Sequence, residues 1–105
     1  MGSARPRPER LAGKLLQIRL ALGLSQTEML KRLGAEDLIA YNQISRYESG
    51  TREPSLLILL QYARVANVLM EALVDDELDL PERLPSKVKH EGIRRVTPFR
   101  RGNRS

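Results

Sequence analysis

The sequence of 105 residues has no cysteine and no tryptophan, and it has one histidine and one phenylalanine. Without cysteine there are no disulfide bonds or thiolate metal ligands, and His90 stands alone, without the further ligands of a zinc or haem site. No apolar run is long enough to cross a bilayer, and the N-terminus lacks a hydrophobic signal region. We therefore expect a soluble, cytoplasmic protein with no metal, no cofactor and no membrane partner.

Catalytic signatures are also missing. The chain has no glycine-rich phosphate loop and no plausible pair of nucleophile and base, and its length suits one modest core rather than a large cleft. Two serines that could attract attention, Ser25 and Ser55, both precede apolar helical patterns and are explained as helix caps. We expect a protein that is not an enzyme.

Charge is unevenly distributed along the chain. The net charge is +5, of which residues 1–8 contribute +2 and residues 87–105 contribute +6, so that residues 9–86 carry −3. Basic tails bind polyanions because they release counterions, although a basic tail can also serve solubility alone. Both interpretations of the tails remain open at this point.

Helical periodicity begins at residue 9. Over residues 9–22, Leu11, Leu15, Ile18 and Leu22 recur on one helical face, and Gly23 follows. Ser25 with Glu28 forms a capping-box pattern ahead of a second helix that ends at Gly34.

A third, short helix should turn Ile44 and Tyr47 inward and end before Gly50, and Ser55 should cap a fourth. The expected core positions of the fourth helix are Leu56, Leu59, Leu60, Ala63 and Ala66. Leu57 and Ile58 fall off that stripe, so either neighbouring helices cover them or they form a patch for a second subunit. A short fifth helix follows over residues 69–74. The acidic run of residues 75–79 lacks the central glycine of a calcium loop and indicates a solvated boundary.

The segment from Gln26 to Gly34, the run ISRYESGTREPSL and the helix after it closely resemble the Cro and phage-repressor (Xre-type) helix-turn-helix transcription regulators. The resemblance covers about residues 15–81. It implies an all-α, five-helix, lambda-repressor-like DNA-binding domain over residues 9–81, between a disordered tail (1–8) and a basic, disordered tail (82–105). Two features depart from the family: Leu30 replaces a small alanine, and the connection after Gly34 is about four residues longer than the usual tight turn. We expect Leu38 and Ile39 to pack back under the enlarged gap.

The resemblance also implies which residues bind duplex DNA. The third helix would read base edges in the major groove, the start of the second would hold a phosphate, and the loop after Gly50 would contact another. Arg19 would form a buried ion pair with Glu48 rather than lie on the surface. The residues expected at the DNA are Gln26, Tyr41, Asn42, Gln43, Ser45, Arg46, Thr51 and Arg52.

The sequence therefore predicts sequence-specific binding of double-stranded DNA and regulation of transcription as a repressor, by a homodimer at least on the DNA. An alternative is an antitoxin-like or adaptor protein whose C-terminal tail binds a protein partner, with DNA binding secondary. A third is nonspecific coating of nucleic acid by the tails, which would make affinity steeply dependent on salt and insensitive to sequence.

Overall fold

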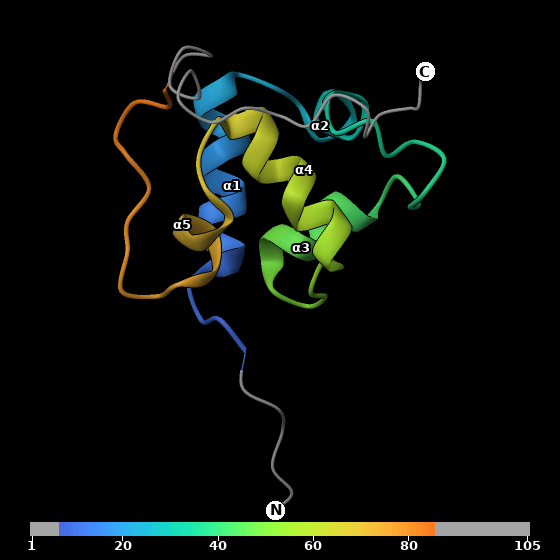
Figure 1. Ribbon diagram of the computed structural model, residues 1–105. Coiled ribbons are helices and arrows are strands. Elements are labelled where there is room, and N and C mark those ends of the chain that lie inside the picture. The colour runs from blue at the N-terminus through green and yellow to red at the C-terminus, as the bar shows by residue number, and fades with distance from the viewer. Residues whose placement is uncertain (1–6, 86–105) are drawn as a thin grey trace, which may run out of the picture.

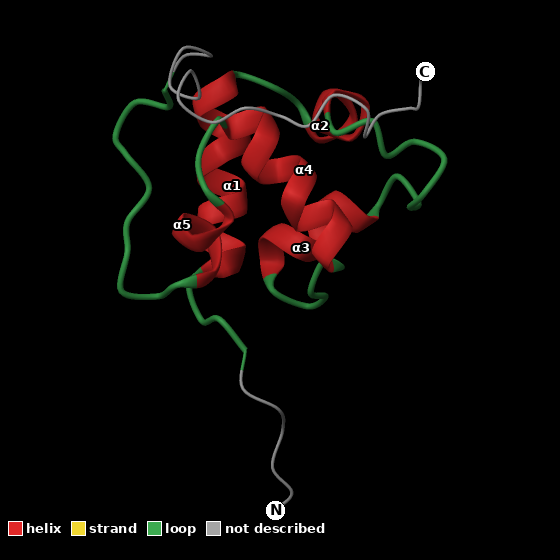
Figure 2. Cartoon of the chain, in the orientation of Figure 1, coloured by secondary structure: helices red, strands yellow, loops and turns green. Residues whose placement is uncertain are grey.

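Five helices account for all regular secondary structure in residues 7–85, the part of the chain that the computed structural model describes (Figures 1 and 2). The all-α, five-helix fold expected from the sequence is confirmed. The expectations for the tails fall largely on residues 1–6 and 86–105, which lie outside the described residues. In chain order the helices are α1 (Leu11–Leu22), α2 (Gln26–Arg32), α3 (Gln43–Ser49), α4 (Leu56–Ala66) and α5 (Met70–Val74).

Helix α1 lies at the centre of the packing. It contacts α3, α4 and α5, while α2 packs against α3 and α4 against α5. None of the helices between residues 7 and 85 has the length and apolar character that spanning a bilayer requires. The largest wholly buried side chains come from every helix and form one core: Leu15, Ile18, Met29, Ile44, Tyr62 and Leu73.

Local signals set most helix ends. The Ser25 hydroxyl accepts the Glu28 N–H at 3.0 Å while the Glu28 carboxylate accepts the Ser25 N–H at 2.8 Å, so the expected capping box is present. The backbone bond from Ser25 lowers the pKa of Glu28. Ser55 caps α4 in the same way, with its hydroxyl accepting the Ile58 N–H. The first helix begins at Leu11 rather than at residue 9.

The buried face of α4 differs from the expected stripe. Leu56 is 73% exposed and Leu60 is half-buried, whereas Ile58 and Tyr62 are buried beside Leu59. Every residue of the run LLILL is apolar, so the run does not show which side of the helix faces the core. Burial of the large Tyr62 ring rotates the buried face by about one residue from the expected one. Leu57, at 68% exposed, is not covered by a neighbouring helix.

The connection between α2 and α3 also corrects an expectation. Ile39 is half-buried against the core as expected, but Leu38 is 67% exposed and does not pack under the gap. The N–H groups of Leu38 and Ile39 both donate to the Ala35 carbonyl, so the chain turns and presents these neighbours to opposite sides. Ala35, which is wholly buried, occupies the inner position instead.

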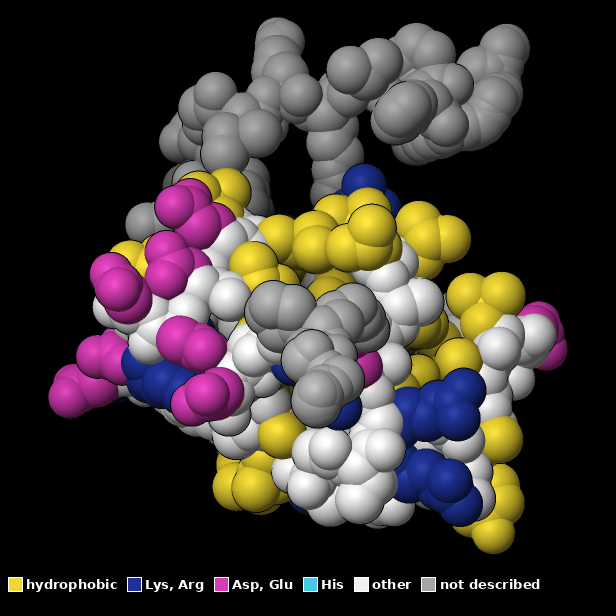
Figure 3. Space-filling model, turned by 90° about the horizontal axis from the view of Figure 1, so that it is seen from below, with side chains coloured by type: hydrophobic (Ala, Val, Ile, Leu, Met, Phe, Trp, Pro, Cys, Tyr) yellow, Lys and Arg dark blue, Asp and Glu magenta, His cyan; other side chains and the backbone are white. Residues whose placement is uncertain are grey.

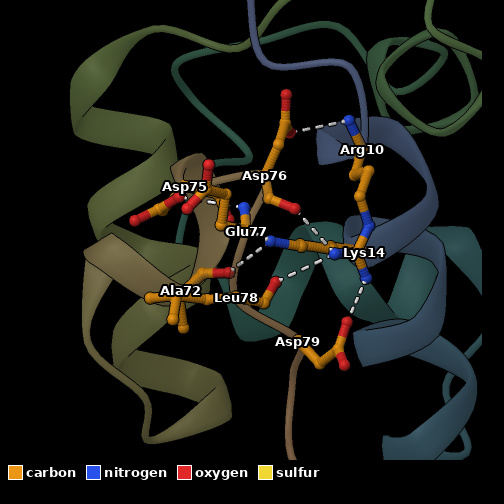
Figure 4. Close-up of polar contacts among 8 residues, drawn as sticks. All are labelled: Arg10, Lys14, Ala72, Asp75, Asp76, Glu77, Leu78 and Asp79. Atoms are coloured by element: carbon orange, nitrogen blue, oxygen red, sulfur yellow. Dashed lines mark hydrogen bonds and ion pairs between the residues drawn. The ribbon is translucent and has the colours of Figure 1, made fainter.

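A contact from the segment after α5 holds the start of α1. The two oxygens of the Asp76 carboxylate accept the N–H groups of Glu9 at 2.8 Å and Arg10 at 3.0 Å. These backbone bonds hold the pKa of Asp76 below its usual range. Arg10 returns hydrogen bonds to the Asp76 and Leu78 carbonyls and forms an ion pair with Asp79 (Figure 4). The acidic run is therefore a clasp on the start of α1, not only a solvated boundary.

Lys14 forms the reciprocal contact and was not anticipated. Its side chain is buried at 2% exposure, and Nζ donates to the carbonyls of Ala72 at 2.7 Å and Asp75 at 2.9 Å, at the end of α5 (Figure 4). Burial lowers the pKa of this amine. The signal in the sequence was its position between Leu11 and Leu15 on the apolar face of α1.

The chain after α5 stays attached to the domain. Leu80 is buried, Leu84 packs against the core, and the Asn67 Nδ2 donates to the Pro85 carbonyl at 3.1 Å. Asn67 ends α4 in the left-handed conformation, with a φ of 63°. Described contacts thus continue a few residues beyond residue 81.

Candidate nucleic-acid interface

Helices α2 and α3 place one polar face of α3 in solvent. Ile44 and Tyr47 are buried on the inner side of α3, and Met29 and Leu30 are buried on α2, which packs against it. Because α3 has two turns, the opposite side is left for the residues expected at the DNA. Asn42, Ser45 and Arg46 are all exposed there.

The exposed side chains of α3 are only lightly engaged by the protein. The Ser45 hydroxyl donates to the Asn42 carbonyl at 3.1 Å, which leaves its lone pairs free to accept. In residues 7–85 the Arg46 guanidinium makes no ion pair or hydrogen bond. Tyr41, directly before the N-cap residue Asn42, is 77% exposed.

Gln43 is placed differently from its neighbours. It is half-buried, its Nε2 donates to Asn42 Oδ1 at 3.5 Å, and its Oε1 is buried with no hydrogen-bond partner among the described residues. A buried acceptor without a hydrogen bond carries a free-energy penalty, and rotation of this amide toward a donor would remove the penalty. Of the four polar residues at 42–46, Gln43 is the least accessible to a ligand.

A buried ion pair holds α3 against α1. Arg19 Nε lies 2.7 Å from Glu48 Oε2 and Arg19 Nη2 lies 3.0 Å from Glu48 Oε1, in a two-pronged contact. The two side chains are 15% and 6% exposed. The hydrogen bond to Glu48 raises the pKa of Arg19, and Arg19 Nη1 also donates to the Leu24 carbonyl at 2.9 Å.

Gln26 joins this pair instead of pointing freely into solvent. Its Nε2 donates to Glu48 Oε1 at 3.1 Å, so Glu48 accepts from α1 and from the start of α2. One carboxylate thereby positions three helices of the domain. Sequence reasoning assigned Gln26 to a phosphate and did not anticipate this contact.

Tyr62 lies behind the ion pair and was also missed. It is wholly buried, its hydroxyl has no hydrogen-bond partner among the described residues, and burial, with the Glu48 charge second, raises its pKa. Its spacing of three and four residues from Leu59 and Ile58 was the available signal.

The loop after α3 is fixed by the end of the helix. Gly50 adopts a φ of 81°, a conformation that favours glycine, and the Arg46 carbonyl accepts the N–H groups of Thr51 and Arg52 at 3.1 and 3.3 Å. Both side chains are exposed, and Arg52 makes no ion pair within the described range. The backbone of Arg52 is therefore tied to that of Arg46 at the end of α3.

A cavity of about 250 Å³ lies between this loop and the segment before α1. Its charged lining consists of Arg7 and Arg52 together with Glu9 and Glu53. Positive and negative groups balance there, so the cavity does not form a dedicated anion site. Among residues 7–85, no three acidic or histidine side chains come together as metal ligands would.

Acidic and basic side chains lie mostly on different sides of the molecule. Figure 3, seen from below, has most acidic side chains gathered on the left, the side of α5 and the clasp. The largest group of lysine and arginine side chains lies on the right, with one smaller acidic group at the right edge. The right is the side of the α2–α3 connection in Figure 1. A polyanion that approaches α3 therefore meets positive charge and stays away from the acidic clasp.

Comparison with known proteins identifies this arrangement. Searches of curated proteins and of solved structures gave no significant match. The helix-turn-helix family model HTH_3 matches residues 15–73, more than half of the chain, and this span contains α2, α3 and α4 in full. The chain therefore belongs to the Cro/C1-type helix-turn-helix family of DNA-binding regulators.

Proposed function

We propose that this protein binds a specific duplex DNA site through α3 and represses transcription from promoters that contain the site. The observation that carries the proposal is the exposed face of α3, where Asn42, Ser45 and Arg46 stand on a helix held by the buried Arg19–Glu48 pair. A rigid reading helix loses little entropy on binding, so its contacts contribute to affinity and selectivity.

The side chains suit base edges of different kinds. Arg46 has the planar fork that pairs with the O6 and N7 of guanine, and Asn42 has the amide that pairs with adenine. Ser45 accepts or donates at either base, and Tyr41 offers a ring and a hydroxyl at the N-terminal end of α3. Gln43 joins these readers by rotating its amide, whose buried Oε1 then gains a partner.

Backbone contacts are proposed on both sides of the reading helix. Thr51 and Arg52 reach a phosphate from the turn that the Arg46 carbonyl fixes. Gln26 has two amide hydrogens, of which one goes to Glu48, and the second reaches a phosphate at the start of α2. The net charge of +6 on residues 87–105 adds affinity for any duplex.

The protein acts as a dimer on the DNA. One two-turn helix reads few base pairs, and two half-sites a helical turn apart are the common solution for this motif. Leu56 and Leu57, exposed side by side at the start of α4, supply apolar surface for a contact between subunits.

Selection of bound duplexes from a random pool by the full chain, at stated salt, tests the proposal. We expect a preferred site with two-fold symmetry and tighter binding to it than to a scrambled duplex. Arg46→Ala should weaken that preference, while Arg83→Ala, the same charge change at an exposed residue outside α3, should keep it. A pool that yields no preferred sequence would leave nonspecific coating by the tails as the activity.

A further inference from the structure

The connection between α2 and α3, residues 33–42, is an ordered part of the domain although it is longer than a tight turn. The motif usually joins its helices through about three or four residues. Here Ala35 is wholly buried and Ile39 packs against the core, and the Ala35 carbonyl accepts two N–H groups at 2.9 and 3.1 Å. Because both anchors are internal to the connection, the residues between and after them hold defined positions.

Two large side chains point outward from this anchored connection. Leu38 is 67% exposed and Tyr41 is 77% exposed, on either side of the half-buried Ile39. Figure 1 shows the connection projecting past the N-terminal end of α3, on the side of the domain opposite α1 and α5. An apolar residue is thus held beside the reading helix without any cover from the domain itself.

We propose that Leu38 is a sequence-reading residue, which packs against the 5-methyl group of a thymine outside the base pairs read by α3. Thymine is the only base that presents a methyl group in the major groove, so an apolar contact there distinguishes it from the other bases. This inference rests on the proposed function, since it extends the same interface by one further contact.

Continuity with α3 favours DNA as the occupant of this surface. The Gln43 N–H donates to the Ala40 carbonyl at 3.0 Å, so the end of the connection leads directly into the first turn of α3. Lys31 and Arg32, both exposed at the end of α2, add positive charge just before the connection. Whatever receives the N-terminal end of α3 therefore also meets Tyr41 and Leu38.

Charge within the connection disfavours a position along the phosphate backbone. Glu36 and Asp37 are exposed and would repel phosphates. In the major groove a carboxylate can accept from the amino group of cytosine, a partner that the phosphates do not offer. Leu38, directly after this pair, is then carried toward the bases.

The reach of the chain fits this position. Leu38 lies four positions before Asn42, and these four steps of the chain span at most about 14 Å. Successive bases along a strand lie about 3.4 Å apart, so Leu38 meets a base within about four base pairs of the one at Asn42. The proposal thus predicts a thymine preference at one flanking position of each half-site.

The test replaces single thymines of the selected site with deoxyuridine, which removes only the methyl group. For the full wild-type chain, one flanking replacement should weaken binding about fourfold, the worth of one buried methyl. The Leu38→Ala variant should bind the unmodified site more weakly by a similar factor. Its affinity should not change further when that thymine is replaced by deoxyuridine. Leu69→Ala, which changes a leucine that is 57% exposed at the start of α5, should behave as wild type.

Three results would overturn the inference while the proposed function stands. Leu38→Ala could retain the methyl dependence, could lose affinity equally for scrambled duplexes, or could change the association state of the free protein in sedimentation, which would make Leu38 a protein contact. In each case Arg46→Ala still weakens the preference for the selected site. If the wild-type chain has no preferred site at all, both the proposed function and this inference fail.

Discussion

Arg19 Nε lies 2.7 Å from Glu48 Oε2, and through this contact α1 holds the C-terminal turn of α3. Because Glu48 also accepts from Gln26, the same carboxylate links the start of α2 to α3. The expected worth of this pair lies in orientation more than in net stability, because desolvation offsets much of the attraction between buried charges.

Removing either partner should be costly. Arg19→Ala or Glu48→Ala leaves an uncompensated buried charge and should lower the free energy of unfolding by about 3 to 5 kcal/mol. Replacing both with apolar residues of similar size should recover much of the loss. Urea unfolding of the three variants measures these changes. Asp79→Ala, which breaks an exposed ion pair, is the control, and its free energy of unfolding should hardly differ from that of wild type. Single variants as stable as that control would contradict the assignment.

The clasp on α1 should make stability depend on pH at the acid end. Asp76 has a folded-state pKa below the ordinary 3.8, so its carboxylate stabilises the fold above that pH and the contribution is lost as pH falls through the folded pKa. Asp76→Ala should therefore be less stable than wild type at neutral pH, and the difference should shrink below pH 3.8. A difference that stays constant from neutral to strongly acidic pH, measured by urea unfolding, would argue against the cap. Asp37→Ala is the exposed control.

Lys14 should be needed for the end of α5. Lys14→Met keeps the length of the side chain but leaves the Ala72 and Asp75 carbonyls without their donor. Because unpaired buried acceptors are penalised, we expect the free energy of unfolding to fall by about 1 to 3 kcal/mol. In this variant, amide hydrogen exchange should become faster in α5 than it is in wild type, and the increase should be larger in α5 than in α3. Unchanged or greater stability would mean that relief from burying the charge outweighs the lost bonds.

Affinity should require a two-fold symmetric site. A dimer that reads two half-sites a helical turn apart loses many contacts when one half is scrambled. Titration of full and half-sites at low protein concentration measures the difference. Equal affinity for both would remove the dimer from the proposal, and Leu57→Ser, at an exposed position of α4, should weaken the full site selectively.

The reading helix and the basic tail should contribute in different ways. Asn42→Ala or Arg46→Ala should cost about 1 to 3 kcal/mol on the preferred site and relax selectivity, with little effect on scrambled duplexes. Deleting residues 87–105 removes a charge of +6, so affinity for both duplexes should fall together and the salt dependence should become shallower. Binding across a salt series distinguishes them. A tail deletion that changes the preferred sequence would make the tail the reader.

The sequence by itself determined most helix ends of this protein, because they depend on residues close together in the chain. Ser25, Ser55 and Gly50 cap or end helices through bonds to residues only a few positions away, so their roles follow from the sequence. The inward position of Ile44 and Tyr47 follows from helical periodicity in the same way, and with it the outward face of α3. That this face contacts bases of DNA was expected from the family resemblance and not from the periodicity.

Tertiary structure decided everything that depends on a distant partner. The run LLILL is apolar at every position, so only packing against α1 and α5 could select Ile58 and leave Leu57 in solvent. Asp76 binds the backbone just before a helix that begins more than sixty residues earlier, and Lys14 and Gln26 find their acceptors on other helices. Helix periodicity reports which face of an element is apolar, whereas the acceptor that meets a polar side chain depends on how separate elements are brought together in space.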